Sequence, residues 1–143
     1  MAGEVASPVV TVELTDSLYR GINPLFFDFE EGGLKSGVFL LKKNHKLEDG
    51  PSVGITRLIS LENFQSLIGD GWGVGELPVS VPQSQSLTVH PLPDQKWGIH
   101  AHAHAVVTNY QKLTNKQIGD AQRALRDALQ KNILVKPVET SAK

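Results

Sequence analysis

The strongest constraint on the fold is a single, fully signalled amphipathic helix near the end of the chain, expected over residues 115–131. Thr114 occupies the N-cap position and Gln117 follows three residues later, which is the spacing of a capping box. Apolar residues then recur at helical spacing: Ile118, Ala121, Leu125, Ala128 and Leu129. A helix with one apolar stripe buries that stripe against another element, so the sequence predicts a helix packed on a sheet.

The remaining segments have the composition of short strands separated by Gly, Pro and polar turns. Strands are expected over residues 8–14, 37–41, 53–59, 97–107 and 133–135, and a short helix capped by Ser60 over residues 61–68. Gly21 and Pro24 limit any helix between residues 18 and 24 to about one turn. Because these elements lack regular βαβ alternation, we expect an α+β fold with a mostly antiparallel or mixed sheet. The domain is expected to span residues 1–143, with flexible ends at 1–7 and 139–143.

The composition is that of an ordinary globular chain, with 143 residues of which 40% are hydrophobic and 20% charged. The formal net charge is −1, from 14 basic and 15 acidic residues, and this balance disfavours duplex nucleic acid as a partner. The absence of cysteine excludes disulfides and thiol nucleophiles. No segment approaches the ~18 apolar residues that span a bilayer, and the first residues lack a signal-peptide pattern. We therefore expect a cytoplasmic protein.

Three histidines alternate with small apolar residues between positions 98 and 107. In an extended strand, His100, His102 and His104 would share one face, and the alanines between them would share the other. The alanine face suits close packing under the predicted C-terminal helix. The histidine face would then meet water, a pocket or a ligand, so we predict these three histidines as ligand-binding residues.

Adjacent histidines of such a strand stand ~7 Å apart and can share one metal ion, whereas the outer pair stands ~13 Å apart and cannot. His102 and His104 are therefore candidate ligands of zinc or nickel. A further ligand would have to come from elsewhere in the chain, with His45, His90, Glu76 and Asp94 as the available donors. The alternative is a half-exposed strand whose polar face carries histidines without any function.

Tyr19 and Arg20, directly before Gly21, form a second candidate site. An arginine in this setting can present its planar guanidinium to a phosphate or carboxylate. The segment resembles the first-strand arginine of ADP-ribosyltransferase-like folds, which implies a dinucleotide held by Arg20. The Glu-x-Glu loop of those enzymes is missing here, so no catalytic glutamate corresponds. The alternative role for Arg20 is an ion pair with Asp16 or Glu13.

Other catalytic motifs are missing from the sequence. Gly-x-Ser-x-Gly is absent, so serine-based hydrolysis is not signalled. The glycine-rich stretch 69–75 leads into a strand-like segment rather than a helix, and this order disfavours a phosphate-binding loop. A pair between His104 and either Ser52 or Asp94 would depend on the tertiary fold.

Several short motifs are spread along the chain: Leu-Tyr-Arg at 18–20 with Pro24, Ser-Val at 52–53, Pro-Leu-Pro-Asp at 91–94, and His-Ala at 104–105. Together they resemble the pattern of a family of small uncharacterised bacterial proteins. The resemblance spans most of residues 18–136 and implies a bacterial origin. Its histidine corresponds to His104, whereas residues 95–102 depart from the family pattern by an insertion that adds His100 and His102. The resemblance therefore directs attention to His104 and Arg20.

Three functional hypotheses follow from the sequence. The first is a small intracellular binding or regulatory module, for a protein partner or a small ligand, that uses the histidine-lined strand face. The second is a small enzyme on a phosphate-bearing or nucleotide-like substrate, with His104 as general acid/base and Arg20 as anion clamp; it requires both residues to converge on one site. The third is a transition-metal site at His102 and His104.

Overall fold

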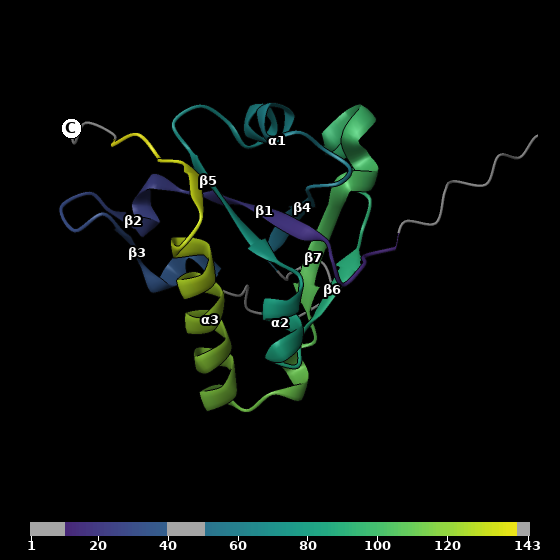
Figure 1. Ribbon diagram of the computed structural model, residues 1–143, viewed down its shortest axis with the longest axis vertical. Coiled ribbons are helices and arrows are strands. Elements are labelled where there is room, and N and C mark those ends of the chain that lie inside the picture. Colours follow the sequence, from purple (N-terminus) through teal and green to yellow (C-terminus); the bar gives the residue numbers. More distant parts are fainter. Residues whose placement is uncertain (1–10, 40–50, 140–143) are drawn as a thin grey trace, which may run out of the picture.

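An antiparallel sheet is the framework of the computed structural model, which describes residues 11–39 and 51–139 (Figure 1). Within these residues it has six strands in the order β6-β7-β4-β1-β5-β8. Their bounds are Ser17–Ile22 (β1), Ser52–Ile55 (β4), Gly73–Pro78 (β5), Thr88–Pro91 (β6), His104–Thr108 (β7) and Ile133–Val135 (β8). A separate two-stranded ribbon joins β2 (Phe27–Asp28) to β3 (Gly33–Leu34). The sheet and the helices confirm the predicted α+β class.

Helices cover both faces of the sheet, as Figure 1 shows for α1 and α3. The α-helices are α1 (Leu61–Ile68), α2 (Ser80–Ser84) and α3 (Asn115–Gln130), and the 3-10 helices are η1 (Pro24–Phe26), η2 (Ser36–Phe39), η4 (Gln95–Ala103) and η5 (Tyr110–Lys112). On one face, Leu18, Ile22 and Val53 of the sheet pack in a large core with Leu125 and Leu129 of α3. On the other face, a smaller core lies beneath α1 and η4.

The smaller core contains Phe64 of α1, Ala103 of η4 and Val74 of the sheet, with Tyr19 and Trp97 packed against it. Successive side chains of a strand point to opposite faces, and this explains how Leu18 and Tyr19 enter different cores. The sheet is therefore buried on both faces where these helices cover it.

Both predicted α-helices are confirmed. Thr114 Oγ1 accepts from the Gln117 backbone N–H, and Gln117 Oε1 accepts from the Thr114 backbone N–H, so the predicted capping box forms at the start of α3. The Ser60 side chain accepts from the Asn63 N–H at the start of α1, and Gly69 ends that helix with a φ of 109°. These ends form as expected because caps use bonds between residues three positions apart.

The strand predicted over residues 97–107 is wrong in its first half. Residues Gln95–Ala103 form the 3-10 helix η4, interrupted at Gly98 with a φ of 57°, and β7 begins only at His104. The neighbouring strands explain the boundary, because β6 ends at Pro91 opposite Ala105 and β4 pairs with His104 through Gly54. Beyond that point the ladder ends: the Ala101 carbonyl still accepts from the Asp94 N–H at 3.1 Å and from the His104 N–H, and the rest of the segment follows 3-10 turns.

Three further strand predictions are wrong, wholly or in part, within the described residues. In the predicted strand 53–59, β4 ends at Ile55 and residues 56–58 form a turn. Residues 11–14 of the predicted strand 8–14 form no strand and lead into a turn, and residues 8–10 lie outside the described range. Residues 37–39 belong to η2, and residues 40–41 also lie outside the described range. Conversely, β1 forms at Ser17–Ile22, where the sequence suggested at most a helical turn.

The flexible ends predicted at 1–7 and 139–143 lie outside the described residues, except for residue 139. In residues 11–39 and 51–139, no helix combines the length and the apolar character that crossing a membrane requires.

Candidate functional site

Ser52 of β4 and His104 of β7 meet on one face of the sheet. The two strands are antiparallel neighbours, with Gly54 opposite His104 and Ser52 opposite Val106. Because directly opposed residues point to the same face, the side chains of Ser52 and His104 lie on the side of the smaller core. His104 Nε2 lies 2.9 Å from Ser52 Oγ, within hydrogen-bonding distance.

The second imidazole nitrogen fixes the tautomer of His104. His104 Nδ1 lies 2.6 Å from the backbone oxygen of Leu92. A carbonyl oxygen can only accept, so Nδ1 carries the proton and donates it to Leu92. In the neutral imidazole, Nε2 is then the unprotonated nitrogen and accepts from the Ser52 hydroxyl. This arrangement joins a hydroxyl, a base and a group that orients the base.

An aromatic chain holds the imidazole plane. The Trp97 ring packs edge-on against His104 at a centroid distance of 4.8 Å, and Phe64 packs edge-on against Trp97 at 5.7 Å. Tyr19 continues the chain, with its ring centroid 5.5 Å from that of Phe64. His104 is 5% exposed whereas Ser52 is exposed, so the base is rigidly buried and the hydroxyl can be reached from solvent.

A pocket of about 470 Å³ opens beside this pair. Its walls are Ser52, His104 and the segment 92–96, which includes the side chains of Asp94 and Lys96. Asp94 Oδ1 accepts from the Lys96 backbone N–H at 2.9 Å and so starts the turn into η4. The pocket therefore has a hydroxyl, an imidazole, a carboxylate and an ammonium group in its lining.

The Arg20 side chain contacts the backbone of the same serine. Its Nη1 donates to the Ser52 carbonyl at 2.8 Å, while Nη2 and Nε donate to the Val38 carbonyl at 2.8 Å and 3.2 Å. The guanidinium also stacks over the Phe39 ring at 5.3 Å. Burial lowers the pKa of Arg20 to about 10, an effect that the nearby Tyr110 opposes, so the guanidinium stays charged at neutral pH.

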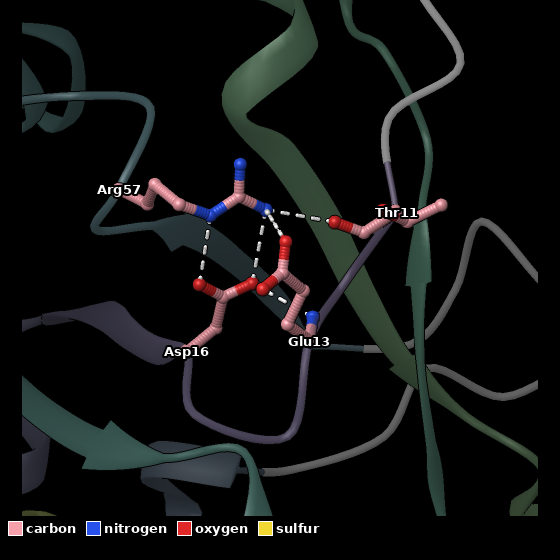
Figure 2. Close-up of polar contacts among 4 residues, drawn as sticks. All are labelled: Thr11, Glu13, Asp16 and Arg57. Atoms are coloured by element: carbon pink, nitrogen blue, oxygen red, sulfur yellow. Dashed lines mark hydrogen bonds and ion pairs between the residues drawn. The ribbon is translucent and has the colours of Figure 1, made fainter.

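The alternative prediction, that Arg20 forms an ion pair with Asp16 or Glu13, is wrong. Arg57 takes that role, because its Nε lies 2.9 Å from Asp16 Oδ1 and its Nη2 lies 3.9 Å from Glu13 Oε2 (Figure 2). Arg20 lies on the strand that follows Asp16 and turns toward η2 instead. Sequence proximity did not indicate this choice, since Arg57 is 41 positions from Asp16.

The other predicted site residues lie away from the pocket lining. His100 and His102 belong to η4, and His102 Nδ1 is buried without a hydrogen-bond partner in the described part of the chain. Tyr19 packs on Phe64, and burial raises the pKa of its hydroxyl, with Glu76 and Glu62 adding to the shift. The structure thus brings His104 and Arg20 together at Ser52, and leaves the three histidines without a common strand face.

The metal prediction has no geometric support within residues 11–39 and 51–139. No group of three or more His, Asp, Glu or Cys side chains there could hold a metal ion. Both ring nitrogens of His104 already have hydrogen-bond partners, so a metal at Nε2 would have to displace the Ser52 hydroxyl. His45, one of the suggested further ligands, lies outside the described residues.

The sequence suggests Ser52 and Asp94 as possible partners of His104, but it does not show which of the two is the partner. Ser52 and His104 are 52 positions apart, and no catalytic motif such as Gly-x-Ser-x-Gly surrounds the serine. The available signal was the pair of short motifs at 52–53 and 104–105, whose meeting depends on strand pairing. Comparison of the chain with protein-family models, curated proteins and solved structures finds no match.

Proposed function

We propose that this protein is a small hydrolytic enzyme in which the Ser52 hydroxyl is the nucleophile and His104 is the general base. The observation that carries the proposal is the 2.9 Å contact between Ser52 Oγ and His104 Nε2, with Nδ1 held by Leu92. A nucleophile and base within about 2.6–3.2 Å, with the base oriented by a third group, is the arrangement that activates serine. The pocket beside the pair offers space for a small substrate.

The reaction proposed is hydrolysis of an ester. Ser52 Oγ attacks the carbonyl carbon as Nε2 takes its proton, and the bond to the leaving oxygen breaks as Nε2 returns that proton to the leaving alcohol. Water then attacks the acyl–serine, with Nε2 accepting a proton from the water. The acid departs and Ser52 Oγ regains a proton from Nε2. Leu92 keeps Nδ1 protonated throughout, which stabilises the imidazolium that forms in both halves.

Lys96 suggests the substrate class. It is the cationic side chain among the residues that line the pocket, so an ester with a nearby phosphate or carboxylate would be attracted there. This agrees with the second hypothesis from the sequence, an enzyme on a phosphate-bearing substrate, although that hypothesis assigned the anion to Arg20. Lys96 is exposed, and the attraction should therefore weaken as salt concentration rises.

Covalent labelling tests the proposal directly. We expect an alkyl fluorophosphonate to phosphonylate Ser52 of the wild-type protein, as identified by peptide mass spectrometry. Ser52→Ala should remove labelling and hydrolysis of a p-nitrophenyl ester, and His104→Gln should slow both by about 10²-fold or more, the usual contribution of a general base. His90→Gln is the matched control, because His90 is an exposed histidine of β6 and not a pocket residue.

Circular dichroism of each variant separates loss of chemistry from loss of fold. Ser52 is exposed and Ser52→Ala removes one hydrogen bond to His104, so the free energy of unfolding should fall by only about 1 kcal/mol and the variant should stay folded. Wild-type protein that neither reacts with the probe nor hydrolyses the ester would contradict the enzymatic proposal.

A binding module is the second candidate, and the same pocket supports it. Both nitrogens of His104 are satisfied in the protein, an arrangement that also suits a residue which only shapes a ligand pocket. Saturable binding of small phosphate esters without turnover would identify this role. The cytoplasmic location, the bacterial origin and a protein partner stay predictions from the sequence.

A further inference from the structure

We propose that Arg20 is a positioning residue that holds the Ser52 backbone from behind the sheet, so that the Ser52 hydroxyl stays directed at His104. The inference rests on the proposed function, since it assigns a role in the same site. It differs from an anion clamp, because the guanidinium acts on the protein backbone and not on the substrate. Three observations support it. The ladder between β1 and β4 ends before Ser52, Arg20 lies on the face of the sheet opposite the pocket, and its guanidinium joins the Ser52 carbonyl to the Val38 carbonyl.

The ladder between β1 and β4 stops short of Ser52. Its pairs are Leu18 with Ile55 and Tyr19 with Gly54. The carbonyl of Pro51 accepts from Val107 N–H and points to β7, so the next carbonyl along the strand, that of Ser52, points the other way, toward β1. The Arg20 side chain supplies the donor there, at 2.8 Å. The guanidinium thus replaces a missing ladder bond at the proposed nucleophile.

Arg20 and the pocket lie on opposite faces of the sheet. Side chains of β1 alternate, and Arg20 shares its face with Leu18 and Ile22, which belong to the large core beside α3. Phe39, over which the guanidinium stacks, belongs to the same core. The side chains of Ser52 and His104 face the smaller core with Trp97. Arg20 therefore touches the site through the main chain alone, and it does not line the pocket.

The bridge to Val38 makes the hold rigid. Two nitrogens of the guanidinium converge on the Val38 carbonyl of η2, while the third donates to Ser52. A planar fork can satisfy both carbonyls in one fixed geometry, whereas the compact ammonium of lysine cannot reproduce that span. Loss of the fork would leave the Ser52 carbonyl without this donor and let β4 shift. A displacement near 1 Å in a reacting group can cost as much as ~10²-fold in rate.

The test compares Arg20→Lys and Arg20→Met with a matched control, Gln122→Met. Gln122 of α3 donates to the Phe39 carbonyl at 3.2 Å, so its removal loosens the same 3-10 helix without touching Ser52. Labelling by a neutral fluorophosphonate reports Ser52 reactivity, and KM and kcat are measured for one neutral and one phosphate-bearing ester. Long-range ¹H–¹⁵N correlation spectra report the bonding of the two His104 ring nitrogens independently of turnover.

We expect both Arg20 variants to label at least about tenfold more slowly and to lose kcat with little change in KM for either ester. The His104 Nε2 resonance should move in these variants and stay in place in Gln122→Met. A rise in KM confined to the phosphate ester, with unchanged labelling and spectra, would overturn the inference in favour of an anion clamp. Equal slowing in Gln122→Met would also overturn it, since general loosening of η2 would then suffice.

Failure of the proposed function is distinguishable from failure of this inference. If wild-type protein is not labelled, the enzymatic proposal fails, and the spectra still decide whether Arg20 sets the Ser52–His104 contact. Movement of the His104 Nε2 resonance in both Arg20 variants supports the positioning role in that case, and an unchanged spectrum overturns it.

Discussion

At the scale of single residues, Asp16 is a buried carboxylate whose two oxygens are both bound (Figure 2). Arg57 donates to Asp16 Oδ1 at 2.9 Å and to Oδ2 at 3.1 Å, and the Glu13 backbone N–H donates to Oδ2 at 2.8 Å. Arg57 also donates to the Thr11 carbonyl at 2.8 Å. This network fixes the segment before β1 against the turn that follows β4.

Because of this network, the free energy of unfolding should decrease as the pH falls into the acid range. The Arg57 hydrogen bond, with help from the Glu13 N–H, lowers the pKa of Asp16 against the opposing effect of burial. A carboxyl whose pKa is lower in the folded state stabilises fully above its unfolded pKa of about 3.9, and this contribution is lost as pH falls through the lowered folded value. Asp16→Asn should therefore cost about 1.5–3 kcal/mol at pH 7, as for other hydrogen bonds to charged groups.

Urea unfolding of wild type and Asp16→Asn between pH 2 and pH 7 measures this difference. The gap should be constant above about pH 5 and should shrink as the acid is protonated below about pH 4. Glu31→Gln is the control, because Glu31 is an exposed acid. A gap that does not change with pH would mean that the Asp16 charge contributes nothing through its pKa.

At the scale of elements, the packing of α3 against β5 depends on a glycine. A Cβ placed on Gly75 would lie 2.6 Å from Leu129 Cδ1 and 2.7 Å from Leu129 Cγ, so the helix could not keep its distance from the strand. Gly119, inside α3, has space: the nearest atom to an added Cβ is the end of Arg123, at 3.6 Å. The close contact with Leu129 therefore requires a glycine at position 75, whereas the space around position 119 would accept a larger residue.

Substitution of these glycines by alanine should shift stability in opposite directions. Gly75→Ala should destabilise by about 1–3 kcal/mol through overpacking. Gly119→Ala should stabilise by about 0.5–1 kcal/mol, because alanine loses less conformational entropy in a helix. Thermal and urea unfolding of the two variants measure both changes. Equal destabilisation by both would show that α3 is under a constraint other than this contact.

The histidine segment shows why an alternating pattern can mislead at this scale. Period two predicts a strand only where a neighbouring strand can accept the backbone bonds. From His104 onward, β4 and β6 provide them, and the prediction holds. Before His104 the ladder ends, with one further backbone bond from the Asp94 N–H to the Ala101 carbonyl. Gly98 takes a positive φ, and the Asp94 side chain caps a 3-10 turn. His100 and His102 leave the predicted face for this reason.

At the scale of the whole molecule, the sheet separates two cores with different consequences for the site. The larger core, with Leu125 of α3 at its centre, supports the fold. The smaller core, with Phe64 and Trp97, holds the His104 imidazole in place. Stability and reactivity should therefore respond to different substitutions.

Leu125→Ala and Trp97→Leu should separate the two effects. Leu125→Ala removes a fully buried side chain and should cost about 2–5 kcal/mol, while fluorophosphonate labelling of the folded protein at low temperature stays at the wild-type rate. Trp97 is only half-buried, so Trp97→Leu should cost less stability but slow labelling, since the imidazole loses its edge contact. If the labelling rate falls in proportion to the loss of stability in both variants, the two cores do not have these separate roles.

The sequence by itself determined the elements whose bonds are local. The helices α1 and α3 form where Ser60 and Thr114 place a cap, because a cap joins groups three residues apart and needs no distant partner. The mixture of short strands with one long amphipathic helix also fixed the α+β class. His104 and Arg20 were predicted as site residues, and Ser52 was named beside Asp94 as a possible partner of His104, but the sequence offered no way to choose between them.

Only the tertiary structure decided those partners. Ser52 is 52 positions from His104 and 32 from Arg20, and the contacts arise because β7 and β1 flank β4 in the sheet. Strand order and register depend on which apolar faces are buried together, and a shift of one residue in β4 would turn Ser52 to the opposite face. No local pattern encodes that choice, since it is made by the packing of the two cores as a whole.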